Sequence, residues 1–190
     1  MKIVFLDRDG VVNQFPGNGE YVTKLKNFSF IPGSLEAIRL LTENGYRIFI
    51  ISNQAGVAKG VYSMSKLKLI NRKMLDGIKK AGGKINKTFY CTHRSDEGCH
   101  CRKPEIGSII KALKSVGQSL QTENTRFFVG DSKSDILTGF RSGCRTILVL
   151  SGRAKRKDVG KWGVRPEYIV KNLQEATKII IGSNGSKEPA

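Results

Sequence analysis

Acidic and hydroxyl side chains follow several short apolar runs in this sequence. The first run leads into Asp7-Arg8-Asp9-Gly10, the second into Ser52-Asn53-Gln54, and a later one into Gly130-Asp131. Asp7 and Asp9 are two residues apart, so in an extended segment both side chains can lean toward one side. Two carboxylates and a third from Asp131 would repel one another unless a hard cation lay among them. Mg²⁺ takes oxygen ligands and shares its shell with phosphate, so these residues predict a Mg²⁺ site that handles phosphate.

Phosphoryl transfer is the chemistry that suits these residue types. A carboxylate can attack phosphorus and form an aspartyl-phosphate, which divides hydrolysis into two easier displacements. A second carboxylic acid can protonate the leaving alkoxide and later deprotonate water. Ser52 offers a hydroxyl to a phosphoryl oxygen, and Lys103 offers a positive charge against the developing negative one. Each residue alone could be an ordinary strand-end cap, but in this order they indicate a phosphohydrolase.

Three of the four cysteines and both histidines lie between residues 91 and 101. Cys91 and His93 on one short arm and Cys99 and Cys101 on another supply three thiolates and an imidazole, a set that suits tetrahedral Zn²⁺. The spacing is tighter than that of a zinc finger, so we expect a structural zinc that staples a loop. His100 lies between two of these ligands and is expected to point away from them. Reduced thiols in an ordinary loop are the alternative.

The elements that position these residues are predicted as alternating strands and helices. Apolar periodicity, Gly and Pro indicate strands at 2–6, 47–52, 85–90, 126–130, 146–150 and 168–170, and helices at 34–45, 63–81, 104–116 and 134–142. This alternation is typical of an α/β fold, a Rossmann-like three-layer sandwich with a mostly parallel sheet. Ligands of such sheets bind beyond the carboxyl ends of the strands. The stretch 13–26 has no clear period and is expected to be a loop at the mouth of the site.

Length and charge narrow the class of protein. A chain of 190 residues predicts one domain, here 1–181, followed by a Gly-, Ser- and Pro-rich tail at 182–190 that we expect to be flexible. No apolar run approaches the ~20 residues that cross a bilayer, and no export signal is recognised, so we expect a cytoplasmic protein. The net charge of +17 attracts phosphate esters or nucleic acid without selecting between them. We expect a small phosphorylated substrate, no membrane and a monomer. The charge keeps nucleic-acid binding as an alternative, although the basic residues are not interleaved with aromatics as stacking on single strands requires.

The motifs resemble those of the haloacid dehalogenase superfamily of phosphohydrolases. The resemblance rests on Asp7-Arg8-Asp9-Gly10, Ser52-Asn53-Gln54, Lys103-Pro104 and the run from Gly130-Asp131 to Asp135, and it spans residues 2 to about 170. Within the superfamily the chain is most similar to the D-glycero-D-manno-heptose 1,7-bisphosphate 7-phosphatases. The histidinol-phosphatase domains are the second likeness.

The resemblance implies a role for each matched residue. Asp7 is expected to be the nucleophile and Asp9 the general acid and base. Mg²⁺ would be held by the Asp7 carboxylate, the Asp9 carbonyl and Asp131, while Asp135 orients Lys103 or a metal-bound water. The expected contacts to phosphate or substrate come from Ser52, Asn53, Gln54, Arg102, Lys103 and Ser132. The expected zinc ligands are Cys91, His93, Cys99 and Cys101.

The spacing between motifs leaves no room for a separate cap domain, so the site is expected to be open and covered only by the 13–26 loop and the zinc loop. Two residues depart from the family pattern: Ser132 stands where Lys is usual, and Lys59 where Arg is usual. Three alternatives to a sugar bisphosphatase stay open. They are a histidinol-phosphate phosphatase, a 3′-phosphatase of nucleic-acid ends, and a binding module without activity.

Overall fold

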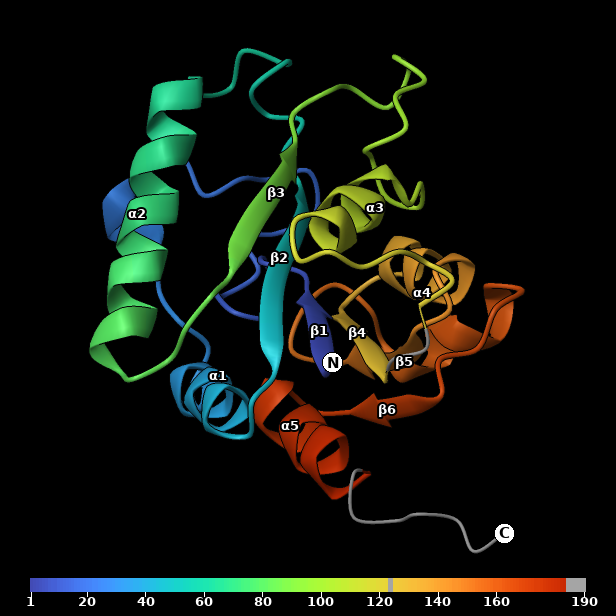
Figure 1. Ribbon diagram of the computed structural model, residues 1–190. Helices are drawn as coiled ribbons and strands as arrows, with labels where there is room; N and C mark the ends of the chain where they lie inside the picture. Colours follow the sequence, from blue (N-terminus) through green and yellow to red (C-terminus); the bar gives the residue numbers. More distant parts are fainter. Residues whose placement is uncertain (123–124, 184–190) are drawn as a thin grey trace, which may run out of the picture.

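A six-stranded sheet organises the computed structural model, which describes residues 1–122 and 125–183. The strands are β1 (Ile3–Leu6), β2 (Arg47–Asn53), β3 (Lys87–Cys91), β4 (Arg126–Gly130), β5 (Arg145–Val149) and β6 (Tyr168–Val170). They pair in the order β3-β2-β1-β4-β5-β6, and every pairing is parallel (Figure 1). The predicted α/β class is therefore confirmed, and the sheet is wholly rather than mostly parallel.

Helices cover both faces of the sheet. One face carries α1 (Ser34–Glu43), α2 (Met64–Lys80) and α5 (Leu173–Gly182), and the other carries α3 (Gly107–Lys114) and α4 (Lys133–Arg141), as Figure 1 shows. Two short 3₁₀ helices, η1 (Leu25–Asn27) and η2 (Arg156–Lys161), lie in the connections after β1 and β5. These two helical layers and the sheet make the three-layer sandwich that the sequence predicts.

Side-chain alternation along β1 shows how the core forms. Val4 and Leu6 pack into the cluster under α1, α2 and α5, whereas Ile3 and Phe5 pack into the cluster under α3. All four are fully buried, because a parallel sheet covered on both faces has no solvated side. The central strands thus form a rigid platform, and the polar residues that follow them are placed at its carboxyl edge.

Most predicted elements agree with the structure to within a few residues. The predictions for 126–130 and 168–170 match β4 and β6, while α3 begins at Gly107 rather than at 104. The C-terminal helix α5 was not predicted, although Asn172 caps it by accepting a hydrogen bond from Glu175 N at 3.1 Å. The expected tail at 182–190 begins inside α5 at Gly182, and its residues 184–190 lie outside the described part of the chain.

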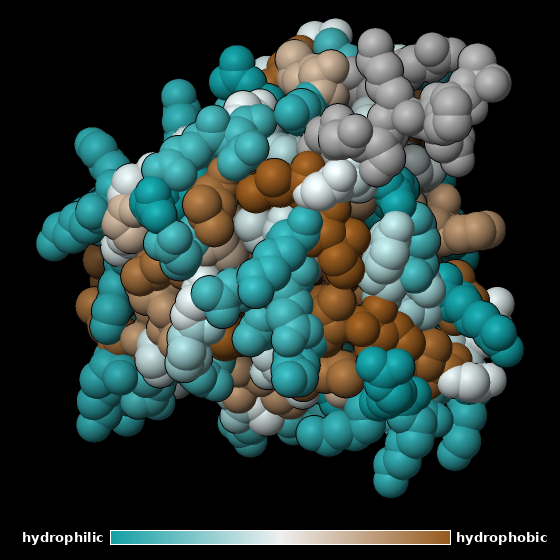
Figure 2. Space-filling view, turned by 90° about the horizontal axis from the view of Figure 1, so that it is seen from below, coloured by the Kyte–Doolittle hydropathy of each residue, from teal (hydrophilic) through white to brown (hydrophobic). Residues whose placement is uncertain are grey.

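The connection between β1 and α1 contains the predicted mouth loop. Among the described residues it holds η1 and two isolated bridges made by Asn13, and no second sheet or cap domain is inserted there. Within the same residues, no helix is long and apolar enough to cross a membrane. Seen from below, in Figure 2, long hydrophilic side chains project around the rim of the molecule, in keeping with the high charge, with hydrophobic residues between them.

Candidate active site and metal centre

Three carboxylates meet at the carboxyl edge of the central strands. Asp7 follows β1, Asp131 follows β4 and Asp135 lies in the first turn of α4, and one oxygen of each lies within 4.8 Å of the others. The pairing of β1 with β4 brings them together, since Asp7 N donates to Val129 O at 3.0 Å. Oxygen donors at this spacing fit a divalent cation such as Mg²⁺, as the sequence predicts, but the third carboxylate of the group is Asp135 rather than the expected Asp9.

Two glycines make room for the Asp131 carboxylate. A Cβ at Gly10 or at Gly152 would collide with the Asp131 side chain, so any other residue at these positions would displace it. Gly10 also has a φ of +86°, a conformation that residues with a Cβ rarely adopt. Asp131 Oδ2 accepts a hydrogen bond from Arg153 N at 2.8 Å. The backbone therefore cradles this carboxylate from the β1 side and from the loop after β5.

The acidic cluster is electrostatically strained without a cation. Burial raises the pKa of Asp7 to about 6, although Lys103 acts in the opposite direction. Burial and repulsion from Asp7 and Asp135 raise the pKa of Asp131 well above its usual value. A divalent ion among these oxygens would remove both penalties, so the donor set fits Mg²⁺ in charge as well as in geometry.

Lys103 is the buried counter-charge of the cluster. Its Nζ lies 2.7 Å from Asp7 Oδ1 and 2.6 Å from Asp135 Oδ1, and it donates to Ile51 O at 2.8 Å. Burial opposes its charge, but Asp135 and Asp7 together raise the pKa of Lys103, so the ammonium group stays protonated. The group is therefore fixed beside Asp7 Oδ1, and among the described residues no hydrogen bond or ion pair is found at Asp7 Oδ2.

Asp135 anchors the loop that carries Asp131. Its Oδ2 accepts from Asp131 N at 3.2 Å and Ser132 N at 3.0 Å, and also from Ser132 Oγ, while its Oδ1 faces Lys103. Because both oxygens are engaged, Asp135 is better placed to orient Lys103 and Asp131 than to bind an ion directly. The Ser132 hydroxyl, predicted to contact substrate, is engaged in this helix-capping arrangement.

Asp9 points into a separate hydrogen-bond network. Its carboxylate accepts from Arg8 at 2.9 to 3.1 Å, from Asn13 Nδ2 at 2.8 Å and from Gln54 Nε2 at 2.7 Å. Arg8 is fully buried and lies over the Tyr90 ring, 5.6 Å from its centroid. These donors hold the Asp9 carboxylate away from the group formed by the other three acids, and Asp9 still lines the same cavity.

Of the polar residues at the end of β2, some line the cavity and others hold the lining residues in place. Ser52 and Asn53 line the cavity, and Asn53 also bonds the backbone of Lys103 through Nδ2 at 3.1 Å and Oδ1 at 3.0 Å. Gln54 is fully buried and lies behind Ser52 and Asp9. For Asn53 and Gln54, the geometry thus favours positioning over the predicted contact with substrate.

These groups surround a cavity of about 310 Å³. Sequence reasoning anticipated eight of its lining residues: Asp7, Asp9, Ser52, Asn53, Arg102, Lys103, Asp131 and Ser132. It missed Arg153, whose guanidinium lies 5.6 Å from the centroid of the Phe15 ring, and it named the 13–26 loop without its lining residues Phe15, Glu20 and Tyr21. The only signal for Arg153 in the sequence was its place in a basic stretch after an apolar strand.

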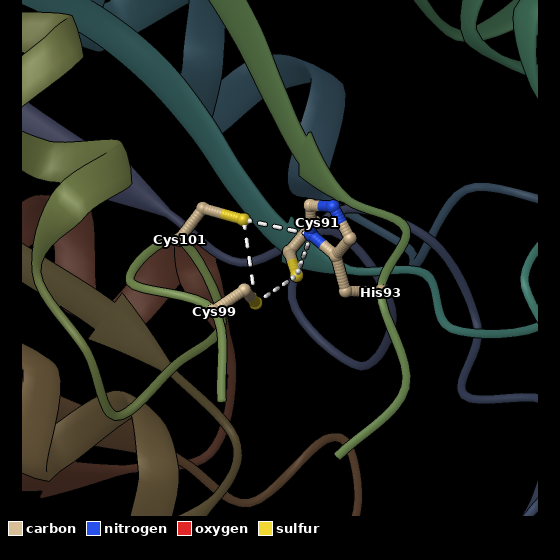
Figure 3. Close-up of side chains that lie close together, drawn as sticks. All are labelled: Cys91, His93, Cys99 and Cys101. Carbon is tan, nitrogen blue, oxygen red and sulfur yellow. Dashed lines mark hydrogen bonds between the residues drawn. The ribbon is translucent and has the colours of Figure 1, made fainter. Parts of the chain in front are cut away.

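The predicted zinc ligands converge in one loop (Figure 3). Cys99 Sγ lies 3.5 Å from Cys91 Sγ and 3.6 Å from Cys101 Sγ, and His93 Nδ1 lies 3.7 Å and 3.2 Å from the sulfurs of Cys91 and Cys101. A tetrahedral Zn²⁺ with bonds of about 2.3 Å would place its sulfur ligands about 3.8 Å apart. The donor set and its spacing therefore fit zinc, and His100 lies outside the group, as predicted.

This cluster connects directly to the acidic centre. Cys91 ends β3, and the segment after Cys101 continues through Arg102 to Lys103, while Ser108 Oγ donates to Cys101 O at 3.0 Å. Burial raises the pKa of the Cys91 thiol to about 12, so a cation is needed to ionise it. An ion bound here would hold the segment that presents Arg102 and Lys103 to the cavity.

Comparison with known proteins places these features in context. A model of HAD-hydrolase-like proteins matches residues 100–176. The D-glycero-β-D-manno-heptose-1,7-bisphosphate 7-phosphatase of Pseudomonas putida is 34% identical over 82% of this chain and 86% of its own length. The corresponding α-anomer 7-phosphatase of Campylobacter jejuni is 36% identical over 83% of this chain and 87% of its own length.

A solved structure agrees closely with the fold. The crystal structure of the D,D-heptose 1,7-bisphosphate phosphatase from B. bronchiseptica, complexed with magnesium and phosphate, superposes with a TM-score of 0.86 at 32% identity. The superposition covers 96% of this chain and 99% of the other. Magnesium and phosphate are the two ligands that the acidic cluster and its cavity would be expected to bind.

Proposed function

The chain belongs to the D-glycero-D-manno-heptose-1,7-bisphosphate 7-phosphatase family of HAD-like hydrolases, and from this membership we propose that it removes the 7-phosphate of D-glycero-D-manno-heptose 1,7-bisphosphate. The observation that carries the proposal is the buried group of Asp7, Asp131, Asp135 and Lys103 at the carboxyl edge of the sheet. It provides a nucleophile, a cation site and a fixed positive charge in one cavity.

Asp7 is the better nucleophile of the two motif carboxylates. Its Oδ1 is paired with Lys103, which leaves Oδ2 to attack phosphorus, whereas both oxygens of Asp9 accept hydrogen bonds. Attack forms the bond from Asp7 Oδ2 to phosphorus and breaks the bond from phosphorus to the sugar oxygen, which takes a proton from Asp9. Water then attacks phosphorus, gives its proton to Asp9 and releases phosphate and free Asp7.

The transferring phosphoryl group is held by Ser52 and Lys103. Ser52 and Lys103 are both buried, so their hydroxyl and ammonium groups act with little competition from water. A Mg²⁺ held by Asp7, Asp131 and the Asp9 carbonyl would neutralise negative charge on the phosphoryl oxygens. In this arrangement Asn53 and Gln54 are supporting residues, and Asp135 holds Lys103 in place.

Recognition of the sugar falls to the rim of the cavity. Its cations there are Arg153, which is exposed, and Arg102, which is half-buried, and the loop with Phe15 and Tyr21 lines the same cavity. We propose that residues 1–181 act as one phosphatase domain, monomeric and cytoplasmic, with a structural Zn²⁺ on Cys91, His93, Cys99 and Cys101. The α- and β-anomer enzymes among the relatives both resemble this chain, so the anomer is a matter for experiment.

Phosphate release from a substrate panel tests the proposal. The panel contains the α and β heptose 1,7-bisphosphates, histidinol phosphate and an oligonucleotide with a 3′-phosphate, each with Mg²⁺. We expect one heptose bisphosphate to have the highest kcat/KM and Asp7→Asn to lower turnover by orders of magnitude. Much faster cleavage of histidinol phosphate or of the oligonucleotide would reject the substrate. Unchanged turnover in the Asp7→Asn variant would reject the mechanism.

A further inference from the structure

A chain of buried hydrogen bonds leads from Tyr62 through Gln54 to Ser52 and Asp9, which line the catalytic cavity and are called its phosphate-binding edge here. The Tyr62 hydroxyl donates to Gln54 Oε1 at 2.5 Å. Gln54 Nε2 in turn donates to Asp9 Oδ2 at 2.7 Å and to Ser52 Oγ at 3.1 Å. Tyr62, Gln54 and Ser52 are all buried, so water does not compete for these groups.

The Asp9 carboxylate fixes the orientation of the Gln54 side-chain amide. If the amide were flipped, its oxygen would face the Asp9 oxygen at 2.7 Å, and two acceptors at that distance repel each other. In the observed orientation the amide oxygen points to Tyr62 and accepts a hydrogen bond from its hydroxyl. Both hydrogens of the amide are then used, one by Asp9 and one by Ser52.

This direction of the hydrogen bonds sets the role of Ser52. Its Oγ accepts a hydrogen bond from Gln54 Nε2, so its own O–H is not needed for that contact and is available as a donor. Toward a neutral hydroxyl, a phosphoryl oxygen can act only as a hydrogen-bond acceptor. A Ser52 hydroxyl that is free to donate therefore suits phosphate. We propose that Gln54 and Tyr62 are positioning residues that keep the Ser52 hydroxyl as a donor to phosphate. This inference rests on the proposed function for the identity of the phosphoryl site.

Packing keeps Tyr62 in place at the head of this chain. A Cβ on Gly56 would collide with the Tyr62 ring, so the ring lies directly on the backbone of the loop after β2. On another side the ring meets Tyr21 at a centroid distance of 5.8 Å, and Tyr21 lines the catalytic cavity. Burial raises the pKa of Tyr62, so its hydroxyl keeps the proton that it donates. Tyr62 thus joins the mouth loop to the phosphate-binding edge.

The test measures binding of inorganic phosphate in the presence of Mg²⁺, by calorimetry and by competitive inhibition of turnover. Tyr62→Phe removes one hydrogen bond of this chain and Gln54→Met removes all three, including the one to Ser52, with little change of volume. We expect each to weaken phosphate binding by about threefold to tenfold, the effect of one hydrogen bond. Gln54→Glu, which cannot donate to Ser52 and faces Asp9 with a second carboxylate, should cost more. Tyr46→Phe is the matched control, because it removes the hydrogen bond from another buried tyrosine hydroxyl, to Ile180 O at 2.8 Å.

Ser52→Ala supplies the background that separates positioning from structure. Without a hydroxyl to direct, Gln54→Met should weaken phosphate binding no further, whereas kcat should still fall because Asp9 loses a partner. Ser52→Thr, which restores a hydroxyl, should restore the sensitivity to Gln54→Met. Equal losses in the Ser52→Ala and wild-type backgrounds, or losses in Tyr62→Phe no larger than in Tyr46→Phe, would overturn the inference. Because calorimetry measures phosphate binding without turnover, this outcome is distinct from failure of the wild-type protein to hydrolyse the bisphosphate, which would reject the proposed function.

Discussion

The side chain of Asn53 forms hydrogen bonds with both the backbone N–H and the backbone C=O of Lys103. Its Nδ2 donates to Lys103 O at 3.1 Å, and its Oδ1 accepts from Lys103 N at 3.0 Å. The two residues are fifty positions apart in the chain, so this pair ties the end of β2 to the segment that follows the zinc cluster. The ammonium group of Lys103 is thereby fixed from its backbone as well as from its carboxylate partners.

Asn53→Ala should therefore reduce turnover without removing any group that touches the reacting phosphoryl. We expect kcat to fall by about tenfold to a hundredfold, because a small displacement of a catalytic charge is costly. Stability should fall by about 1 to 3 kcal/mol, since the buried polar groups of Lys103 lose their partner. Steady-state kinetics and thermal unfolding check this. Asn44→Ala, which removes an exposed amide that caps α1, should leave turnover unchanged.

The zinc cluster should be needed for turnover more than for the fold. Cys99→Ser replaces one of the four converging donors in Figure 3, so we expect lower zinc content and a fall in kcat as Arg102 and Lys103 lose their support. Metal analysis and circular dichroism on the same sample test this. Cys144→Ser changes a buried cysteine outside the cluster and should keep the zinc. Full activity in a preparation free of zinc would show that the ion does not position Lys103.

The sequence predicts which residues gather better than it predicts what each one contacts. Asp7, Asp131 and Lys103 follow from the rule that ligands bind at the carboxyl ends of parallel strands, and they do meet there. The rule does not say which strands are neighbours. Asp131 lies beside Asp7 because β4 pairs with β1, and that pairing depends on the packing of the whole sheet.

Contacts made by backbone groups and side-chain amides could not be predicted from the sequence pattern. Gln54 matches a motif and was predicted to contact substrate, yet its amide faces inward to Asp9 and Ser52. Arg153 was not predicted, since its bond to Asp131 comes from a backbone N–H that any residue except proline has. The helix α5 was missed because its apolar run was read without the Asn172 cap.

The raised pKa values predict how pH affects the metal-free protein. A buried carboxyl whose folded pKa is raised binds its proton more tightly in the folded state than in the unfolded state. Its contribution to stability is therefore complete below pH about 4 and is lost as pH rises through the folded value, about 6 for Asp7. With a chelator present, we expect stability to fall across this window by on the order of 2 to 3 kcal/mol. Mg²⁺ should restore it above pH 7.

Asp131→Asn should stabilise the metal-free protein, because it removes one of the carboxylates that repel one another in the acidic cluster. The amide can still accept the hydrogen bond from Arg153 N, but it removes a charge that burial, Asp7 and Asp135 all disfavour. At pH 8 without metal we expect the melting temperature to rise by several degrees, about 2 to 4 °C per kcal/mol for a domain of this size. Stabilisation by Mg²⁺ and turnover should both be lost. Asp76→Asn, at an exposed position on α2, should change neither.

Arg153 should decide how strongly the enzyme prefers a bisphosphate over a monophosphate. Three cationic side chains line the catalytic cavity, and one of them, Lys103, is buried and paired with Asp7 and Asp135. Arg102 and Arg153 are the two that remain to meet the phosphate that is not transferred. The guanidinium of Arg153 lies on the Phe15 ring, which limits its freedom before substrate binds.

Arg153→Gln removes this charge and keeps the backbone N–H that bonds Asp131. We expect KM for the heptose bisphosphate to rise by about tenfold to a hundredfold, the effect of a charge-assisted hydrogen bond, with a smaller change in kcat. For the same sugar carrying only the 7-phosphate, KM should change little. Arg156→Gln, a loss of charge in η2 at a residue that does not line the cavity, is the matched control. An equal rise in KM for the two sugars would show that Arg153 acts through the general field of the protein rather than by contact with the second phosphate.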